Sequence, residues 1–175
     1  MIYKKSAESV VFSEGLTDLH LIGEGTNLVT REKLNPHYIA GFIDGEGSFV
    51  FFFSPRRDMK SGFETNLDFQ IELRIDDREI LERIKETLGC GIINVLNYER
   101  YEKWMPHVKY RIGRISDLRN ILIPLLREYP LQAKKRKNFE IFAEAVEIKW
   151  QKGHKTEEGM KRLQILREEI IKLRG

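Results

Sequence analysis

Residues 35–53 predict a short apolar helix that passes directly into a β-strand. Asn35 is a suitable N-cap, and Pro36 fits the first helical position, where its missing N–H is not needed. The helix then meets residues 44–47, Asp-Gly-Glu-Gly, where two glycines are expected to break it around two carboxylates. Residues 48–53 are mostly aromatic or β-branched and predict a strand. Because a helix C-terminus carries partial negative charge, carboxylates at this position indicate a bound cation.

A second strand and a helix are predicted after this unit. Residues 65–75 alternate between apolar and polar side chains, which predicts a strand with one buried face. A polar turn at 55–62 would join it to the first strand as a hairpin. Residues 76–79, Asp-Asp-Arg-Glu, predict a capping box for a helix over 78–88, which ends at Gly89.

The pattern of a hairpin followed by a helix then occurs again. Residues 92–96 and 107–112 predict two strands joined by a long tip at 97–106. A further helix is expected to start at Ser116 as its cap and to end near residue 130. This order predicts an α+β fold with a four-stranded antiparallel sheet, which has helices on one face and a free polar face on the other.

Two additional C-terminal helices are predicted at 138–150 and 156–173, where helical packing explains the apolar residues. With them, residues 35–175 form a single domain that is large enough to bury its own core. Residues 1–34 have mixed polarity and no sustained period, so we interpret them as an N-terminal extension.

Four consecutive cations, Lys134 to Lys137, precede the first of these helices. Like charges in a row repel unless an anion lies nearby, so they indicate phosphate contact. Since cations are unfavourable at a helix N-terminus, we expect the helix to begin after them, at Asn138. The segment 91–137 has eleven Lys and Arg against four Asp and Glu, although the whole chain carries only +3. This basicity favours a phosphate-binding face, with a solvated surface as the alternative.

Several function classes lack their sequence signals. No Walker loop, dinucleotide fingerprint or Cys/His cluster occurs, so we expect no nucleotide cofactor, and the single Cys90 is most simply a small apolar residue. No apolar run is long enough to span a membrane, and no signal-peptide pattern begins the chain. We therefore expect an intracellular protein without a membrane partner, in the cytoplasm or nucleoid or in an organelle.

Residues 39–47, Ile-Ala-Gly-Phe-Ile-Asp-Gly-Glu-Gly, resemble the signature of the LAGLIDADG homing endonucleases. The match holds in character at all nine positions. The resemblance spans about residues 35–137 and implies the αββαββα core of that family, whose curved sheet forms a saddle on DNA. It also implies site-specific cleavage of double-stranded DNA, with an intron as the usual host element.

The resemblance assigns roles to residues at the end of the signature. Hydrolysis of a phosphodiester needs an activated water and stabilised charge on two oxygens, which divalent ions held by carboxylates supply. By resemblance, Glu46 and the Gly45 carbonyl bind Mg²⁺, with Mn²⁺ as a substitute, and Asp44 is structural and closes its own helix end. Lys134 aligns best with a basic catalytic residue of the family, and Lys135 and Lys137 remain alternatives.

The signature occurs once, and one chain offers one such carboxylate, so we expect a homodimer. Two signature helices packed side by side would bring the two copies of Glu46 together. Ala40, Gly41 and Gly45 form a small-residue face that allows close approach. By resemblance, each subunit would then cleave one strand of a long, pseudo-palindromic target.

The free face of the sheet is expected to contact this DNA. Asn66, Gln70 and Arg74 are polar members of the 65–75 alternation, and amide and guanidinium groups suit major-groove base edges. Simple solvation is the alternative for each of them. Further predicted contacts lie in the first turn, the second hairpin and the basic cluster: Arg56, Arg57, Lys60, Asn94, Lys109, Arg111, Lys135 and Lys137.

Two alternatives keep the fold without DNA cleavage: an intron RNA maturase and a non-cleaving DNA-binding regulator. The intact Glu46 and the basic cluster favour the nuclease. A third class, a protein-interaction domain, predicts no steep salt dependence of DNA binding.

Overall fold

The computed structural model describes residues 32–58, 62–97 and 105–174. In chain order these residues form α1 (Pro36–Glu46), β1 (Gly47–Pro55), β2 (Phe63–Arg74), α2 (Arg78–Leu88), β3 (Ile92–Leu96), β4 (His107–Ile112), α3 (Ile115–Asp117), α4 (Ile123–Glu128), α5 (Lys135–Trp150) and α6 (Glu157–Arg174). The predicted α+β fold is confirmed. Lys60, most of the predicted extension at 1–34 and most of the tip at 97–106 lie outside the described residues.

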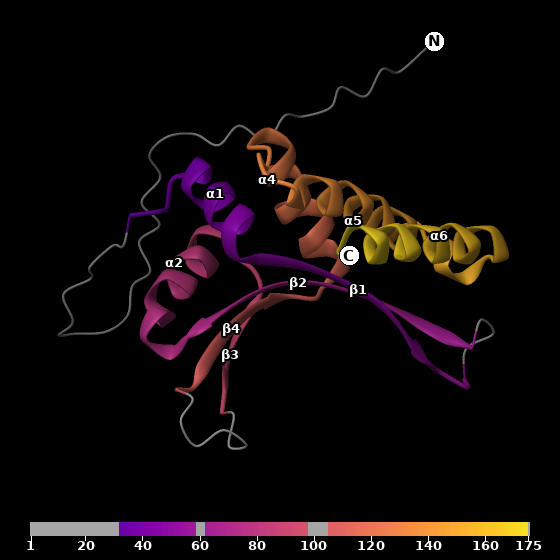
Figure 1. Cartoon of the computed structure of the whole chain (residues 1–175), viewed down its shortest axis with the longest axis horizontal. Coiled ribbons are helices and arrows are strands. Elements are labelled where there is room, and N and C mark those ends of the chain that lie inside the picture. The colour runs from indigo at the N-terminus through magenta and orange to yellow at the C-terminus, as the bar shows by residue number, and fades with distance from the viewer. Residues whose placement is uncertain (1–31, 59–61, 98–104, 175) are drawn as a thin grey trace, which may run out of the picture. The chain divides into compact units, whose positions relative to one another are not determined.

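The four strands lie in the order β1-β2-β4-β3, and every neighbouring pair is antiparallel. The register aligns Phe49 with Phe69 and Phe69 with Ile112, so these buried side chains share one face of the sheet. Figure 1 shows the helices gathered over this inner face. The opposite, outer face carries the polar members of the predicted alternation. The period-two pattern therefore separated the core from the free face correctly.

Aromatic rings join the sheet to α5. The ring of Phe49 lies 5.5 Å from that of Phe69, 5.6 Å from that of Phe139 and 5.2 Å from that of Phe142, measured between centroids. Tilted pairs at such distances add to the stabilisation from apolar burial. This cluster fixes α5 against the first strand, and so fixes where the first turn of α5 lies. None of the described helices is long and apolar enough to cross a membrane.

The helix α1 begins as predicted and ends later than predicted. Asn35 accepts a hydrogen bond from the His37 N–H at 2.8 Å, and Pro36 occupies the first turn. Gly45 is helical, and only Gly47 ends the helix. A Cβ at Gly47 would lie 2.7 Å from the Ile43 carbonyl oxygen and 2.9 Å from the Phe69 ring. Glycine is required there because the backbone passes close to its neighbours.

Two predicted caps are absent from the described structure. The predicted capping box at 76–79 does not form, because residues 75–77, Asp76 included, form a 3₁₀ turn that leads directly into α2. Asp77 immediately precedes α2, and its side chain forms no capping hydrogen bond. Ser116 lies inside the next helical segment and bonds to Asp117 rather than capping it. The predicted end of α2 is confirmed, since Gly89 has a left-handed φ of 69°.

The helix α5 begins at Lys135, three residues before the predicted Asn138, so three of the cations lie in its first turn. The expectation that cations disfavour this position was wrong here. The carboxylate of Asp44 lies at this end and accepts hydrogen bonds from the Gln132 and Ala133 N–H groups, at 2.7 and 2.8 Å. A negative charge at a helix N-terminus is favourable and offsets the repulsion of the cations.

Candidate functional site

The C-terminal end of α1 brings a carboxylate, two carbonyls and a lysine together. Glu46 is the last residue of α1 and is exposed. The ammonium of Lys135 in α5 donates hydrogen bonds to the carbonyl oxygens of Gly45, at 2.9 Å, and Ile43, at 3.1 Å. The last turn of α1 contains no basic residue, so this distant lysine supplies the positive charge that the helix end favours.

Burial lowers the pKa of Lys135, and the charges of Asp44 and Glu46 oppose that shift. Desolvation disfavours the ammonium form, whereas nearby carboxylates stabilise it. Lys135 is therefore held in the electrostatic field of both acids of the signature. By contrast, Lys134, just before α5, and Lys137, in its first turn, are exposed. The structure thus places Lys135, rather than Lys134, against the signature helix.

Asp44 has a structural contact, but with a different partner from the one predicted. Its Oδ2 bonds to the backbone of Gln132 and Ala133, rather than closing the end of its own helix. These bonds join α1 to the segment that leads into α5. Asp44 thereby positions the chain just before Lys135. Its other oxygen, Oδ1, is buried and has no hydrogen-bond partner among the described residues.

The oxygen donors at this end fit a hard divalent cation, because Glu46 offers a carboxylate and Gly45 a carbonyl. The Lys135 ammonium already shows that this carbonyl attracts a positive charge. The described residues contain no group of three His, Cys, Asp or Glu that could hold a metal ion. A cation held by Glu46 and the Gly45 carbonyl would therefore need further ligands from water, phosphate or a second copy.

The exposed side of α1 has apolar and very small residues. Tyr38 is 48% exposed, and its ring lies 6.0 Å from that of Phe42. Gly41 and Gly45 are exposed, and a Cβ at either would meet nothing within 4 Å. Ala40, which the sequence assigned to the same surface, is only 6% exposed and belongs to the core. Nothing in the described chain requires glycine at 41 or 45.

The register places the other predicted DNA contacts of the strands on the outer face. Gln70 of β2 lies opposite Arg111 of β4. On the other side of β4, Asn94 of β3 lies opposite Lys109. Asn66 and Arg74 share the face of Gln70, because they lie an even number of residues away along β2. These six residues come from β2, β3 and β4 and lie on the outer face, which also carries the exposed Phe52 opposite Asn66 and Ile92 opposite Arg111.

Acidic neighbours that were not among the predicted DNA contacts pair with the cations of this surface. Arg111 binds Asp68 at 2.7 Å, and Lys109 binds Glu72 at 2.9 Å. Arg74 likewise binds Asp76, at 2.8 Å. Cross-strand register could have indicated the Lys109 pair, since Glu72 lies directly opposite. The pairs of Arg74 and Lys109 are partly exposed on both sides and worth only ~0–1 kcal/mol, so a phosphate or base could replace the acid. The Asp68 carboxylate is buried, so its removal from Arg111 costs more.

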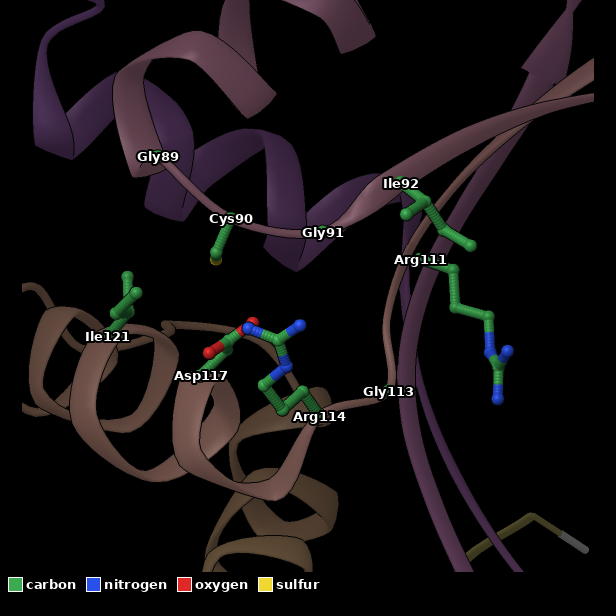
Figure 2. Close-up of a pocket in the computed structure, with 9 residues that line it drawn as sticks. All are labelled: Gly89, Cys90, Gly91, Ile92, Arg111, Gly113, Arg114, Asp117 and Ile121. Atoms are coloured by element: carbon green, nitrogen blue, oxygen red, sulfur yellow. The ribbon is translucent and has the colours of Figure 1, made fainter.

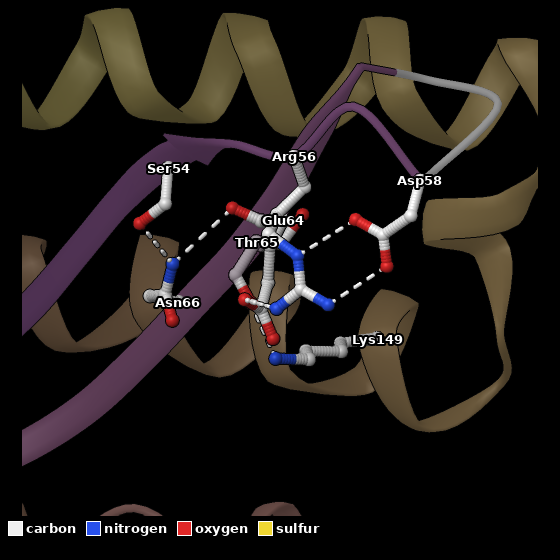
Figure 3. Close-up of polar contacts among 7 residues, drawn as sticks. All are labelled: Ser54, Arg56, Asp58, Glu64, Thr65, Asn66 and Lys149. Carbon is white, nitrogen blue, oxygen red and sulfur yellow. Dashed lines mark hydrogen bonds and ion pairs between the residues drawn. The ribbon is translucent and has the colours of Figure 1, made fainter.

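The hairpin of β1 and β2 has its own polar cluster, shown in Figure 3. Arg56 donates two hydrogen bonds to Asp58, both 2.9 Å long, and one to Glu64 at 3.1 Å. These contacts hold the pKa of Asp58 down at about 2. From α5, the Lys149 ammonium reaches the backbone oxygen of Thr65. Arg57 is exposed beside this cluster.

A cavity of about 500 Å³ lies elsewhere, where β3 and β4 meet α3. Figure 2 shows Cys90, Arg114 and Asp117 around it. Burial raises the pKa of the Cys90 thiol, which disfavours a reactive thiolate. The cavity contains neither Glu46 nor Lys135 in its lining, so it is separate from the candidate site.

Known proteins share this arrangement of elements. The family model for LAGLIDADG endonucleases matches residues 39–146. A probable intron-encoded endonuclease 2 of Neurospora crassa is 34% identical over 131 residues, which are 74% of this chain and 28% of that protein. The homing endonuclease I-ApeII of Aeropyrum pernix is 31% identical over 110 residues, 62% of this chain and 60% of that protein. The chain spans less than a third of the length of the first curated relatives that it matches.

Solved structures of homing endonucleases have the same fold as this chain. The meganuclease I-SmaMI bound to uncleaveable DNA superposes with a TM-score of 0.70 at 27% identity, over 78% of this chain and 45% of that one. I-SmaMI has also been solved on an uncleaved DNA target in the presence of calcium ions. The homing endonuclease I-TnaI gives a TM-score of 0.68 at 27% identity, over 77% of this chain and 86% of that one.

Proposed function

The chain belongs to the LAGLIDADG endonuclease family, and on that premise we propose that it is a site-specific endonuclease that hydrolyses phosphodiester bonds in double-stranded DNA. One observation carries the proposal: Glu46, the Gly45 carbonyl and Lys135 meet where α1 passes into β1. DNA lying along the outer face of the sheet would present a phosphate near this point. The relatives named as intron-encoded endonucleases support an intron as the host element.

Glu46 and the Gly45 carbonyl would hold the divalent cation, which we propose to be Mg²⁺, with Mn²⁺ as a substitute. When bound, the ion would stabilise charge on the phosphate oxygens and acidify a water. The protein contributes the positions of these oxygens and of the basic group beside them. Asp44 fixes the segment before α5, and that segment sets where the Lys135 ammonium lies.

Lys135 is our candidate for the basic catalytic residue, in place of Lys134. Its ammonium is held beside the signature acids and is partly desolvated, so its charge is screened less than that of an exposed lysine. From there it would stabilise negative charge that develops on the phosphate. Lys134 and Lys137 are exposed at the start of α5 and are proposed as contacts to the DNA backbone.

A second copy of the chain would complete the site. The exposed glycines of α1 have open space above them, although glycine inside a helix costs ~0.5–1 kcal/mol relative to alanine. A partner helix packed closely against α1 would explain why glycine occurs at positions 41 and 45. This chain also covers 45% of the I-SmaMI chain, so two copies match the length of that DNA-bound protein. We therefore propose a homodimer that joins through Gly41 and Gly45, with each subunit cutting one strand.

The test is cleavage of a randomised DNA library with and without Mg²⁺, by the unaltered chain and by Glu46→Gln. We expect cleavage at a defined sequence only when the ion and Glu46 are both present, with DNA binding retained by the variant. Specific binding with no Mg²⁺-dependent cleavage by the unaltered chain would favour the regulator. Preferential binding of a structured intron RNA would favour the maturase.

A further inference from the structure

Asn66 lies on the outer face of β2, with its side-chain amide held in one orientation. Its Nδ2 donates to the Ser54 hydroxyl oxygen at 2.9 Å and to the Glu64 backbone oxygen at 3.3 Å (Figure 3). A backbone carbonyl can only accept, so the amide nitrogen must face Glu64. Both amide protons are thereby used. The amide oxygen Oδ1 receives no hydrogen bond from any described residue.

Ser54 completes a donor–acceptor pair beside Asn66. Its hydroxyl oxygen accepts from Asn66, so the hydroxyl proton remains available, and no described residue accepts it. The two residues lie on neighbouring strands and are only partly buried. The nearby cations differ in this respect, because Arg56 and Arg111 already bind acids within the chain. At this place the outer face therefore offers one acceptor beside one donor.

Base edges differ in how they match that pair. In the major groove adenine presents an acceptor, N7, beside its N6 amino donor, and cytosine presents the N4 amino donor. Guanine presents two acceptors, and thymine presents an acceptor and a methyl group. An acceptor such as Oδ1 selects a base with an amino group, and a donor beside it selects adenine over cytosine. The usual two-point contact of one asparagine with adenine is not available, because Nδ2 is already used.

We propose that Asn66 is a specificity-determining residue that accepts a hydrogen bond from N6 of an adenine, while Ser54 donates to N7 of the same base. This rests on the proposed function, in which the outer face of the sheet binds DNA. Glu64 acts through its backbone oxygen and only orients the amide. The assignment predicts one adenine in each half of the target that depends on these two side chains.

The experiment first selects binding sites from a random double-stranded library with the unaltered chain, Asn66→Leu and Ser54→Ala. Lys161→Ala, on the exposed surface of α6, is the matched control. We expect one adenine position per half-site whose preference Asn66→Leu abolishes, while Ser54→Ala lets cytosine replace adenine there. Thermal melting of each variant shows whether it remains folded. If Asn66→Leu unfolds, Ser54→Ala still tests the proposal, because Asn66 keeps its hydrogen bond to the Glu64 backbone oxygen in that variant.

Base analogues at the selected position then test the individual atoms. Purine lacks the N6 amino group and should weaken binding by about fivefold or more, with no such loss for Asn66→Leu. An adenine with carbon at position 7 should weaken binding by the unaltered chain and leave Ser54→Ala unaffected. A guanine or thymine at that position, equal binding of purine and adenine, or an even loss across all positions would overturn the assignment. If the unaltered chain enriches no sequence at all, the proposed function fails instead.

Discussion

The Lys135 ammonium lies 2.9 Å from the carbonyl oxygen of Gly45, which precedes it by ninety residues. This contact joins the first turn of α5 to the last turn of α1. It places a cation against a helix end that has partial negative charge, where the charge of Glu46 also acts on it. The geometry distinguishes Lys135 from the three cations beside it in the sequence.

Replacing Lys135 by alanine should therefore slow DNA cleavage by about a hundredfold or more, as the loss of a preorganised charged group does in other active sites. Lys134→Ala is the matched control and should slow cleavage far less, because that side chain is exposed. Single-turnover cleavage rates at saturating enzyme measure both. Equal losses in the two variants would contradict the assignment.

Asp44→Asn should destabilise the fold by about 1.5–3 kcal/mol, because it removes the charge from an acceptor of two backbone hydrogen bonds. Urea unfolding monitored by circular dichroism measures this change. Asp58→Asn removes a carboxylate of the exposed hairpin and should have a clearly smaller effect. If the two variants lose the same stability, Asp44 does not join α1 to α5 as described.

Gly41→Ala should stabilise the isolated subunit by about 0.5–1 kcal/mol, because alanine favours helix and its Cβ has open space. The same change should weaken the homodimer, since the added methyl group separates the two helices. Sedimentation equilibrium measures dimer dissociation, and chemical unfolding measures stability. Gly47→Ala is the contrast and should destabilise the subunit itself, because its Cβ would lie 2.7 Å from the Ile43 oxygen. A dimer that is unaffected by Gly41→Leu would rule out this interface.

The carboxyl group of Asp58 should titrate near pH 2, because Arg56 hydrogen-bonds to its charged form. A folded-state pKa below the ordinary 3.8 means that the ion pair stabilises the hairpin above about pH 4. That contribution is lost as the pH falls from 4 towards 2. Arg56→Ala should raise the Asp58 pKa towards the ordinary 3.8, because it removes the largest cause of the lowered value. Carbon-detected NMR titration follows the carboxyl group directly, and an unchanged pKa in the variant would refute the pairing.

The features that depend on local sequence were predictable. The alternation in β4 and the left-handed Gly89 follow from side-chain period and turn chemistry, and both agree with the structure. The features that were missed depend on residues far apart in the sequence. The early start of α5 reflects the carboxylate of Asp44, which approaches only after folding. The choice among Lys134, Lys135 and Lys137 likewise needed the tertiary contact with α1.

The outer face illustrates the same limit. Its residues could be assigned from the alternation in β2, but the pairing of Arg111 with Asp68 depends on the alignment of two strands from different hairpins. The free oxygen of Asn66 was also not predictable, because Ser54 and Glu64 orient the amide only after the hairpin has formed. Sequence alone identifies which side chains can meet DNA, and the structure shows which of their atoms remain available.

The most direct test of the central claim uses a mixed dimer, purified through two different tags, in which one subunit carries Glu46→Gln. Its products are measured on a cognate DNA duplex labelled on both strands, in the presence of Mg²⁺. Two subunits that each provide one Glu46 predict that double-strand cleavage is lost and that at most one strand is nicked. Cleavage of both strands at the rate of the unaltered dimer, or full activity of a monomer, would contradict the account.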